Sequence, residues 1–174
     1  CGGYQMLGES LADPFGYDSG HAGSVTTGIG LLDTTTEFVE NKRTIQMKGK
    51  FGKVEGILAG LSGKDFYGYE IHSGVTKHGK NRPLNQVEPI NEKGESFAEG
   101  SQTVHGSVNV YGSYIHGIFD GEGIAAKVVE ALLAKKGLTM EDVKVIDYKQ
   151  YKEQQYDILA ENIRKNLDMK RIYE

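Results

Sequence analysis

Cysteine is nearly absent from this chain, because Cys1 is the only one among its 174 residues. A single thiol cannot form an internal disulfide, and disulfides are the usual support of small secreted domains. Long apolar runs are absent as well: no stretch approaches the roughly 18 residues that a membrane-spanning helix needs, and the first residues show no signal-peptide pattern. These absences predict a soluble protein of the cytoplasm that has no membrane partner.

Basic residues are too few and too scattered for a nucleic-acid surface. The 20 Lys and Arg are outnumbered by 24 Asp and Glu, and the net charge is −4, so nucleic acid is not an expected partner. The phosphate-loop pattern Gly-x-x-x-x-Gly-Lys-Ser/Thr does not occur, so the chain by itself is not expected to bind ATP. The composition that remains, with 38% hydrophobic residues and 24 glycines, suits one turn-rich α/β or β-rich domain.

The expected elements are a short helix, many strands and two late helices. Helical spacing covers residues 4–11 and stops at Asp13-Pro14, because the residue before a proline avoids the α region. Composition and alternation predict strands at 26–32, 34–39, 42–51, 56–61, 66–75 and 108–119. Residues 77–106 mix glycine, proline and charge, which predicts a long surface excursion with one strand near 84–90. Apolar stripes predict helices at 124–133, capped by Gly137, and at 148–167.

The lone cysteine opens the run Cys1-Gly2-Gly3-Tyr4-Gln5-Met6-Leu7-Gly8. Glycines beside a thiol allow the sharp turn that projects a nucleophile and leaves backbone N–H groups free for an oxyanion. Two functional interpretations stay open: an amino-terminal nucleophile whose own α-amine is the base, or a strand-to-helix nucleophile turn whose preceding strand is not part of this sequence. The third interpretation is a small buried apolar residue.

A thiol that attacks at neutral pH needs a base, and histidine is the usual partner. Of the five histidines, His21 and His78 lie in polar stretches beside glycine and are expected to be solvated, and His105 lies near the start of a predicted strand. His116 ends an alternating β run and precedes Gly117, so the chain can turn there while the imidazole faces a site at the carboxyl end of the strand. The alternative for His116 is a core histidine bonded to the backbone.

Glu70 and His72 lie two residues apart in a predicted strand, so their side chains share one face, while Tyr69 and Ile71 share the other. The pair is either the solvated face of a half-exposed strand or part of a binding site. A metal site is not expected there, because a third and a fourth ligand at suitable spacing are missing.

Four motifs occur in order along the chain: the cysteine run, Gly28-Ile-Gly-Leu-Leu-Asp33, Gly68-Tyr-Glu-Ile-His72 with Gly74, and Tyr114-Ile-His-Gly-Ile-Phe119. Together they resemble the class I (triad-type) glutamine amidotransferases, in the branch of cobyric acid synthase and cobyrinate diamide synthase. The ending Tyr156-Asp157-Ile-Leu-Ala-Glu161, then Arg164 and Leu167-Asp168, is similar to the carboxyl end of the cobyric acid synthase members. Each motif alone is weak, and their order over nearly the whole chain makes the resemblance specific.

The resemblance implies an α/β fold of the class I glutamine amidotransferase (flavodoxin-like) type, with three layers and a mixed sheet, and it implies glutamine hydrolysis. By it, Cys1 attacks the side-chain amide of glutamine, and His116 carries the proton, first as base and then as acid toward ammonia. The N–H of Gly2 supplies half of the oxyanion hole, and Gln5 matches a position that contacts bound glutamine. The residues that line or support the substrate pocket are Tyr69, Glu70 and His72.

The resemblance also implies a longer protein. Residues 1–174 correspond to the carboxyl-terminal part of a glutaminase domain without its leading strands, and family members carry a P-loop synthetase domain before it. The glutaminase part needs no cofactor or metal, whereas the synthetase domain uses ATP and Mg²⁺. Ammonia would pass to that domain and amidate corrin carboxylates, namely side chains b, d, e and g of adenosylcobyrinic a,c-diamide.

One position in the site departs from the wider family. Many class I members carry a glutamate two residues after the histidine to orient the imidazole, whereas this chain has Ile118 there. A Cys–His dyad is therefore expected, with Glu70 as a candidate for the orienting group. The alternatives are an amino-terminal-nucleophile amidotransferase, a related amidotransferase that acts on another carboxylate, and a non-catalytic binding or subunit-contact module.

Overall fold

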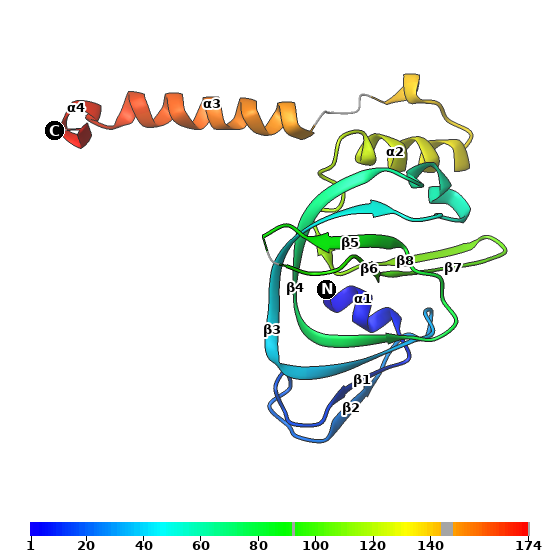
Figure 1. Ribbon diagram of the computed structural model, residues 1–174. Helices are drawn as coiled ribbons and strands as arrows, with labels where there is room; N and C mark the ends of the chain where they lie inside the picture. The colour runs from blue at the N-terminus through cyan, green and yellow to red at the C-terminus, as the bar shows by residue number, and fades with distance from the viewer. Residues whose placement is uncertain (92, 144–147, 174) are drawn as a thin grey trace.

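Two long antiparallel strands, β3 (Thr34–Phe51) and β4 (Asp65–His78), form the centre of the fold in the computed structural model (Figure 1). The structure describes residues 1–91, 93–143 and 148–173. The other strands are β1 (Ser10–Asp13), β2 (Ser24–Thr27), β5 (Asn85–Pro89), β6 (Phe97–Glu99), β7 (Ser101–His105), β8 (Val108–Gly112) and β9 (Ile115–His116). The helices are α1 (Gly2–Leu7), α2 (Ile124–Lys135), α3 (Tyr148–Asn166) and α4 (Met169–Tyr173), with 3-10 helices η1 (Gly56–Leu61) and η2 (Met140–Asp142).

The main sheet is mixed. β1 runs parallel to β3, whereas the pairs β1–β2, β3–β4, β3–β5, β4–β9 and β5–β6 are antiparallel. One edge of β3 therefore binds β4, and the other edge binds β1 at its start and β5 at its end. β7 and β8 form a separate two-stranded sheet. The prediction of an α/β fold with a mixed sheet is confirmed.

A β-bulge bends the β3–β4 pair. Phe38 lies opposite Gly74 and Arg43 lies opposite His72, so β3 advances more residues than β4 between these two pairs. Extra residues on one strand bend the sheet and increase its twist. The sequence predicted separate strands at 34–39 and 42–51, and the structure joins them into one bent strand. Figure 1 shows α1 inside the curve of this bent pair.

Two apolar clusters hold the elements together. The larger one joins the sheet to η1 and the start of α2 through Met47, Phe51, Val54, Leu61, Phe66, Leu84, Val87, Ile115, Ile118 and Ile124. The smaller one, with Tyr4, Leu32, Val110 and Tyr114, fastens α1 to β8 and to the chain beyond it. Complete burial of one such side chain contributes about 1.5–3 kcal/mol. The smaller cluster therefore anchors the helix that begins directly after Cys1.

Several predicted elements differ from the structure in type or in length. Residues 56–61 form the 3-10 helix η1 rather than a strand, the strand predicted at 26–32 ends at Thr27, and the first helix ends at Leu7 instead of residue 11. Gly8 gives the reason for the last difference, because a Cβ there would lie 2.6 Å from the carbonyl oxygen of Thr34. The chain passes this close to β3 as it leaves the helix and continues as β1.

Residues 77–106 are not a surface excursion, and that prediction is wrong, whereas the strand expected near 84–90 is confirmed as β5. They contain β5, β6 and β7, and they contribute Leu84 and Val87 to the larger apolar cluster. β5 pairs with the end of β3, which is remote in the sequence. The composition of a segment does not reveal which distant strand it pairs with. Residues 77–106 were therefore interpreted as polar and irregular. The strand predicted at 108–119 is likewise divided, into β8 and β9, at Ser113 and Tyr114.

The two late helices are confirmed. α2 ends at Lys135, and Gly137 follows it with a φ of 71° and donates its N–H to the carbonyl of Ala134. α3 ends one residue before its predicted limit, and Figure 1 shows it extending away from the sheet. The apolar side chains of its predicted stripe are exposed, including Tyr151, Ile158, Leu159 and Ile163.

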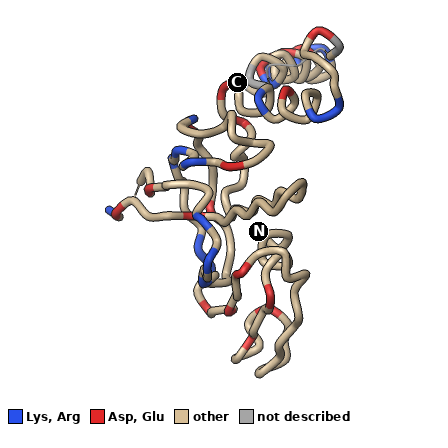
Figure 2. Tube along the Cα trace, turned by 90° about the vertical axis from the view of Figure 1, so that its right-hand side faces the viewer, with Lys and Arg blue, Asp and Glu red and all other residues tan. Residues whose placement is uncertain are grey.

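The charges are unevenly distributed along the chain. Residues 1–33 contain no Lys or Arg, and Figure 2 shows acidic residues at the end of the molecule formed by β1 and β2. Lys and Arg lie on the sheet and the late helices, interspersed with Asp and Glu. Exposed pairs such as Lys48 with Glu88, at 2.8 Å, contribute little stability because water screens them.

Candidate active site

Cys1 lies immediately before α1, where its backbone carbonyl accepts the N–H of Gln5 at 3.1 Å. Its thiol is exposed and donates to the carbonyl oxygen of Ile71 on β4, with Sγ and O 3.4 Å apart. The first N–H groups of a helix have no acceptor within the helix, and a Cβ added at Gly2 or Gly3 would meet no atom within 4 Å. The thiol therefore lies beside accessible, unpaired backbone donors.

The loop 28–32 caps the end of α1. Ile29 donates its N–H to the carbonyl of Met6 at 2.7 Å, and Leu31 and Leu32 both donate to Leu7 at 2.9 and 2.8 Å. These bonds satisfy the carbonyl groups that the last turn of a helix leaves unpaired. At Gly28 a Cβ would lie 2.0 Å from the carbonyl oxygen of Gly8. The Gly28 motif thus holds the cysteine-bearing helix in place by close backbone contact.

His116 ends β9, directly opposite Tyr69 of β4. Residues that face each other in an antiparallel pair share one side of the sheet, and both side chains are exposed. Gly117 follows with a φ of 79°, and Asp120 donates its N–H to the carbonyl of Gly117 at 2.8 Å. The turn predicted after His116 is confirmed, and the imidazole is not a core histidine.

Cys1 and His116 approach the same short segment of β4. The thiol touches Ile71, and His116 faces Tyr69, two residues away, which corresponds to about 7 Å along a strand. α1 lies on the other side of β4, since Gln5 closely approaches Gly74 there. Within the described chain, no hydrogen bond joins the thiol to the imidazole. The fold brings the two residues to one segment without direct contact between them.

Glu70 and His72 share the other side of β4, as predicted, and they form a cluster with Arg43. The Nε of Arg43 lies 2.5 Å from Glu70 Oε2, and the Nε2 of His72 lies 2.8 Å from Glu70 Oε1. The Nδ1 of His72 donates to the carbonyl of Gly74 at 2.7 Å, because a carbonyl oxygen only accepts. The Nε2 bond then needs a second proton, carried by the ring or by the carboxyl group. Glu70 therefore lies between Arg43 and His72 and contacts both of them.

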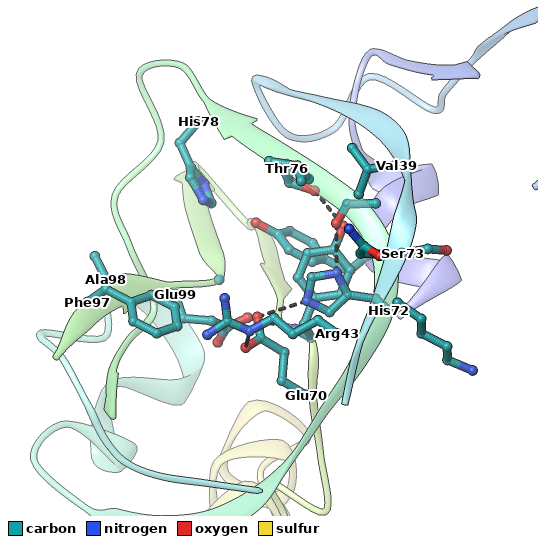
Figure 3. Close-up of a pocket in the computed structure, with 17 residues that line it drawn as sticks. Val39, Arg43, Glu70, His72, Ser73, Thr76, His78, Phe97, Ala98 and Glu99 are labelled. Atoms are coloured by element: carbon teal, nitrogen blue, oxygen red, sulfur yellow. Dashed lines mark hydrogen bonds and ion pairs between the residues drawn. The ribbon is translucent and has the colours of Figure 1, made fainter. Parts of the chain in front are cut away.

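This cluster forms one wall of a pocket of about 560 Å³. Figure 3 shows Arg43, Glu70 and His72 converging on one side of the pocket, with His78 on another. The Nδ1 of His78 bonds to the hydroxyl of Ser101 at 2.8 Å, and burial lowers the pKa of this histidine. His78 therefore lines the pocket from the end of β4 rather than from a loop, and it is exposed to solvent, as expected.

The residues predicted to bind substrate lie on two sides of β4. Tyr69 lies on the exposed side with His116, whereas Glu70 and His72 face the pocket on the side of α1. Gln5 is buried between α1 and β4, and Gly2 lies exposed beside Cys1. Glu70 pairs with Ile115 and points away from His116, so it is not placed to orient that imidazole. Ile118 is buried in the larger apolar cluster.

Sequence reasoning missed Glu99, which also lines the pocket and is only 4% exposed. Burial raises the pKa of this carboxyl, against the opposing effect of hydrogen bonds from Tyr114, Asn85 and Ser113. Glu99 lies in the segment that was interpreted as a surface excursion, where a lone glutamate among charges gives no sign of burial. Tyr114 was visible as part of a motif, but its contacts were not.

Among the described residues, no group of three or more His, Cys, Asp or Glu side chains is arranged to hold a metal ion. None of the helices in this part of the chain combines the length and the apolar character that a membrane-spanning segment requires.

Residues 1–124 match the CobB/CobQ-like glutamine amidotransferase domain family. The chain is 44% identical over 178 residues to the cobyric acid synthase of Lachnoclostridium phytofermentans, with 100% of this chain and 34% of that protein covered. It is 43% identical over 180 residues to the cobyric acid synthase of Ruminiclostridium cellulolyticum, covering 100% and 33%. It is 38% identical over 170 residues to the cobyric acid synthase of Listeria welshimeri, with 97% of this chain and 31% of that protein covered. The chain thus spans about a third of the length of the curated relatives that it matches.

Proposed function

Because the chain belongs to the CobB/CobQ-like glutamine amidotransferase family, we propose that its site hydrolyses glutamine to glutamate and ammonia. The sulfur of Cys1 attacks the side-chain amide carbon, and its proton passes through His116 to the departing ammonia. Water then attacks the resulting thioester while His116 accepts a proton from it. The products are glutamate and a regenerated thiol.

The observation that carries this proposal is the exposed thiol at the start of α1, beside the unpaired N–H groups of the first helical turn. The tetrahedral intermediate of acyl transfer carries a negative oxygen, which such donors stabilise. The N–H of Gly2 is the donor nearest in sequence to the nucleophile. His116 lies on the neighbouring strand at the same segment of β4, and catalytic hydrogen bonds often form fully only with substrate bound.

The test is a glutaminase assay on the full-length protein. We expect Cys1→Ala to abolish ammonia release, because no other group of this site can form the thioester. We expect His116→Ala to lower kcat by about 10²–10⁴-fold, the range for a lost acid–base group. His105→Ala is the matched control, since His105 is also exposed at the end of a strand but lies on the β7–β8 hairpin.

Wild-type rates in the Cys1→Ala variant would overturn the assigned nucleophile. A wild-type protein that releases no ammonia from glutamine would instead favour a non-catalytic binding module. Equal losses in His116→Ala and His105→Ala would remove the special role of His116.

We further propose that this glutaminase works within a cobyric acid synthase. The support is the name of the curated relatives and the fact that the chain corresponds to about a third of their length. A synthetase portion of the same polypeptide would then use ATP and Mg²⁺ to activate corrin carboxylates, at side chains b, d, e and g of adenosylcobyrinic a,c-diamide. Ammonia from this site would complete each amide.

Product analysis by mass spectrometry tests the substrate. With glutamine, ATP, Mg²⁺ and adenosylcobyrinic a,c-diamide, the wild-type protein should amidate those side chains. Cys1→Ala should lose amidation from glutamine and retain it with added ammonium salt. Amidation of a different carboxylate would overturn the corrin assignment but would leave the glutaminase proposal intact.

A further inference from the structure

Three hydrogen-bond donors converge on the buried carboxylate of Glu99, at the end of β6. Its Oε1 accepts the backbone N–H of Tyr114 at 2.6 Å. Its Oε2 accepts the hydroxyl of Ser113 and the side-chain amide of Asn85, each at 2.8 Å. Asn85 lies directly opposite Glu99 in the β5–β6 pair, so the pairing of these two strands keeps the carboxylate of Glu99 beside the amide of Asn85. Only an acidic side chain offers acceptor sites for so many donors at once.

Ser113 relays this contact one step further along the chain. Its hydroxyl donates to Glu99 and accepts the N–H of Ile115 at 3.0 Å. Ser113 and Tyr114 are the whole connection between β8 and β9, and Ile115 is followed by His116. The carboxylate of Glu99 therefore binds, directly or through one hydroxyl, each of the three residues that precede His116.

The strand that carries His116 makes few other hydrogen bonds, and its remaining support is the packing of Ile115 in the larger apolar cluster and of Tyr114 against His72. β9 contains two residues, which pair with Tyr69 and Glu70 of β4, and the chain turns at Gly117. A pairing of two residues does not by itself hold a strand in one position. The imidazole is exposed on the side of Tyr69, where no hydrogen bond from the described residues orients the ring. Its position is consequently set by the backbone on which it stands.

We propose that Glu99, acting through Ser113, is the positioning residue for His116. The carboxylate holds the 113–115 backbone, and this backbone fixes where the imidazole stands relative to the substrate and the Cys1 thiol. This inference rests on the proposed glutaminase function. Glu99 and Ser113 do not touch the substrate in this assignment, and Glu70 serves the neighbouring Arg43–His72 cluster instead.

Ser113→Ala is the decisive variant, because it removes the relay and leaves the charge of Glu99 in place. In the full-length protein we expect kcat for glutamine hydrolysis to fall about 10- to 100-fold, since a displacement of about 1 Å can cost 10²-fold. The KM for glutamine should stay within about threefold, because no binding contact is lost. Ser113→Thr keeps the hydroxyl and should restore kcat to within about threefold of the wild-type value.

Ser19→Ala is a matched control. The hydroxyl of Ser19 donates to the buried carboxylate of Asp13 at 2.8 Å and accepts the N–H of His21 at 3.1 Å, which resembles the bonding of Ser113 in a loop remote from β9, and it also bonds to the hydroxyl of Ser24 at 2.9 Å. Both alanine variants lose the same kinds of bond, so their melting temperatures should fall by similar amounts. Only Ser113→Ala should lose kcat.

The inference is overturned if Ser113→Ala keeps the wild-type kcat, if Ser19→Ala loses as much, or if KM rises while kcat stays constant. Failure of the proposed function has a different signature, namely a wild-type protein without glutaminase activity or a Cys1→Ala variant with full activity. Either of these results would remove the present inference together with its premise.

Discussion

The imidazole of His72 lies flat against the phenol ring of Tyr114, with ring centroids 3.7 Å apart and planes within 15° of parallel. His72 belongs to β4, and Tyr114 belongs to the connection that leads into β9. The hydroxyl of Tyr114 also bonds to Thr76 at 2.5 Å. One stacked pair therefore joins the central strand to the segment that carries His116.

The His72–Tyr114 stack should give a measurable coupling energy. In a double-mutant cycle of His72→Ala and Tyr114→Ala, we expect the two losses of unfolding free energy to be non-additive by about 0.5–1.5 kcal/mol, the range for paired rings. Urea denaturation of the four proteins measures this quantity. Tyr114→Phe keeps the stack and removes only the Thr76 bond, so its coupling to His72→Ala should persist. Additive losses in the first cycle would show that the stack contributes nothing.

Gly28→Ala should destabilise the protein, because the new Cβ would lie 2.0 Å from the carbonyl oxygen of Gly8. Overpacking of this kind costs about 1–3 kcal/mol, and here it would also displace the loop that caps α1. Gly60→Ala is the matched control, since a Cβ there meets only Lys127 Cδ at 3.8 Å. Chemical denaturation should show a lower unfolding midpoint for the first variant alone. Equal midpoints would contradict the close contact.

Asp13→Asn should lose stability near neutral pH. Burial opposes the charge of Asp13, but hydrogen bonds from Ser19, Asp18 and Tyr17 outweigh this effect and lower its pKa to about 2. A lowered pKa means that the ionised form favours the folded state, so this contribution is complete above the ordinary value of 3.8 and disappears as the pH falls through about 2.

The measurement for Asp13 is the unfolding free energy of wild type and Asp13→Asn as a function of pH. Their difference should be largest near neutrality and should shrink below the ordinary pKa of the carboxyl. Asp18→Asn serves as the control, because the side chain of Asp18 is exposed. A difference in unfolding free energy that is independent of pH would show that the charge of Asp13 does not anchor the loop of residues 17–19.

Glu99→Gln should show the opposite pH dependence. Burial raises the pKa of Glu99 above its ordinary value of 4.5, so the protonated form favours the folded state. That contribution is complete below the ordinary pKa and is lost as the pH rises through the raised one. The variant has no such group, so its stability relative to wild type should improve across this rise. Denaturation curves recorded below the ordinary pKa and above the raised pKa of Glu99 measure this change. If the variant instead lost stability relative to wild type as the pH rises, the prediction would be contradicted.

Much of the site's composition was predictable from the sequence, because motifs are local. The run from Cys1 to Gly8, the turn after His116 and the shared face of Glu70 and His72 all follow from neighbouring residues and strand alternation. The class of fold and the two late helices were predictable for the same reason. The assignment of Cys1 and His116 as the catalytic pair stays a proposal.

The division of those residues between the two sides of β4 was not predictable. It depends on the register that sets His116 opposite Tyr69 and Glu70 opposite Ile115, and register between distant strands is a property of the packed sheet. Glu99 is the clearest case. In the sequence it is a charge in a polar stretch, and only the pairing of β5 with β3 and of β6 with β5 buries it.

The sequence by itself therefore determined the chemistry available to this protein: one thiol beside flexible glycines, a histidine at a strand end, and an order of motifs typical of one family. Tertiary structure decided which groups act on one another, joining Arg43 and Glu70 to His72, and Glu99 to the backbone before His116. The physical reason is that local bonding depends on adjacent residues, whereas burial and hydrogen-bond partners depend on strands that meet only when the sheet closes.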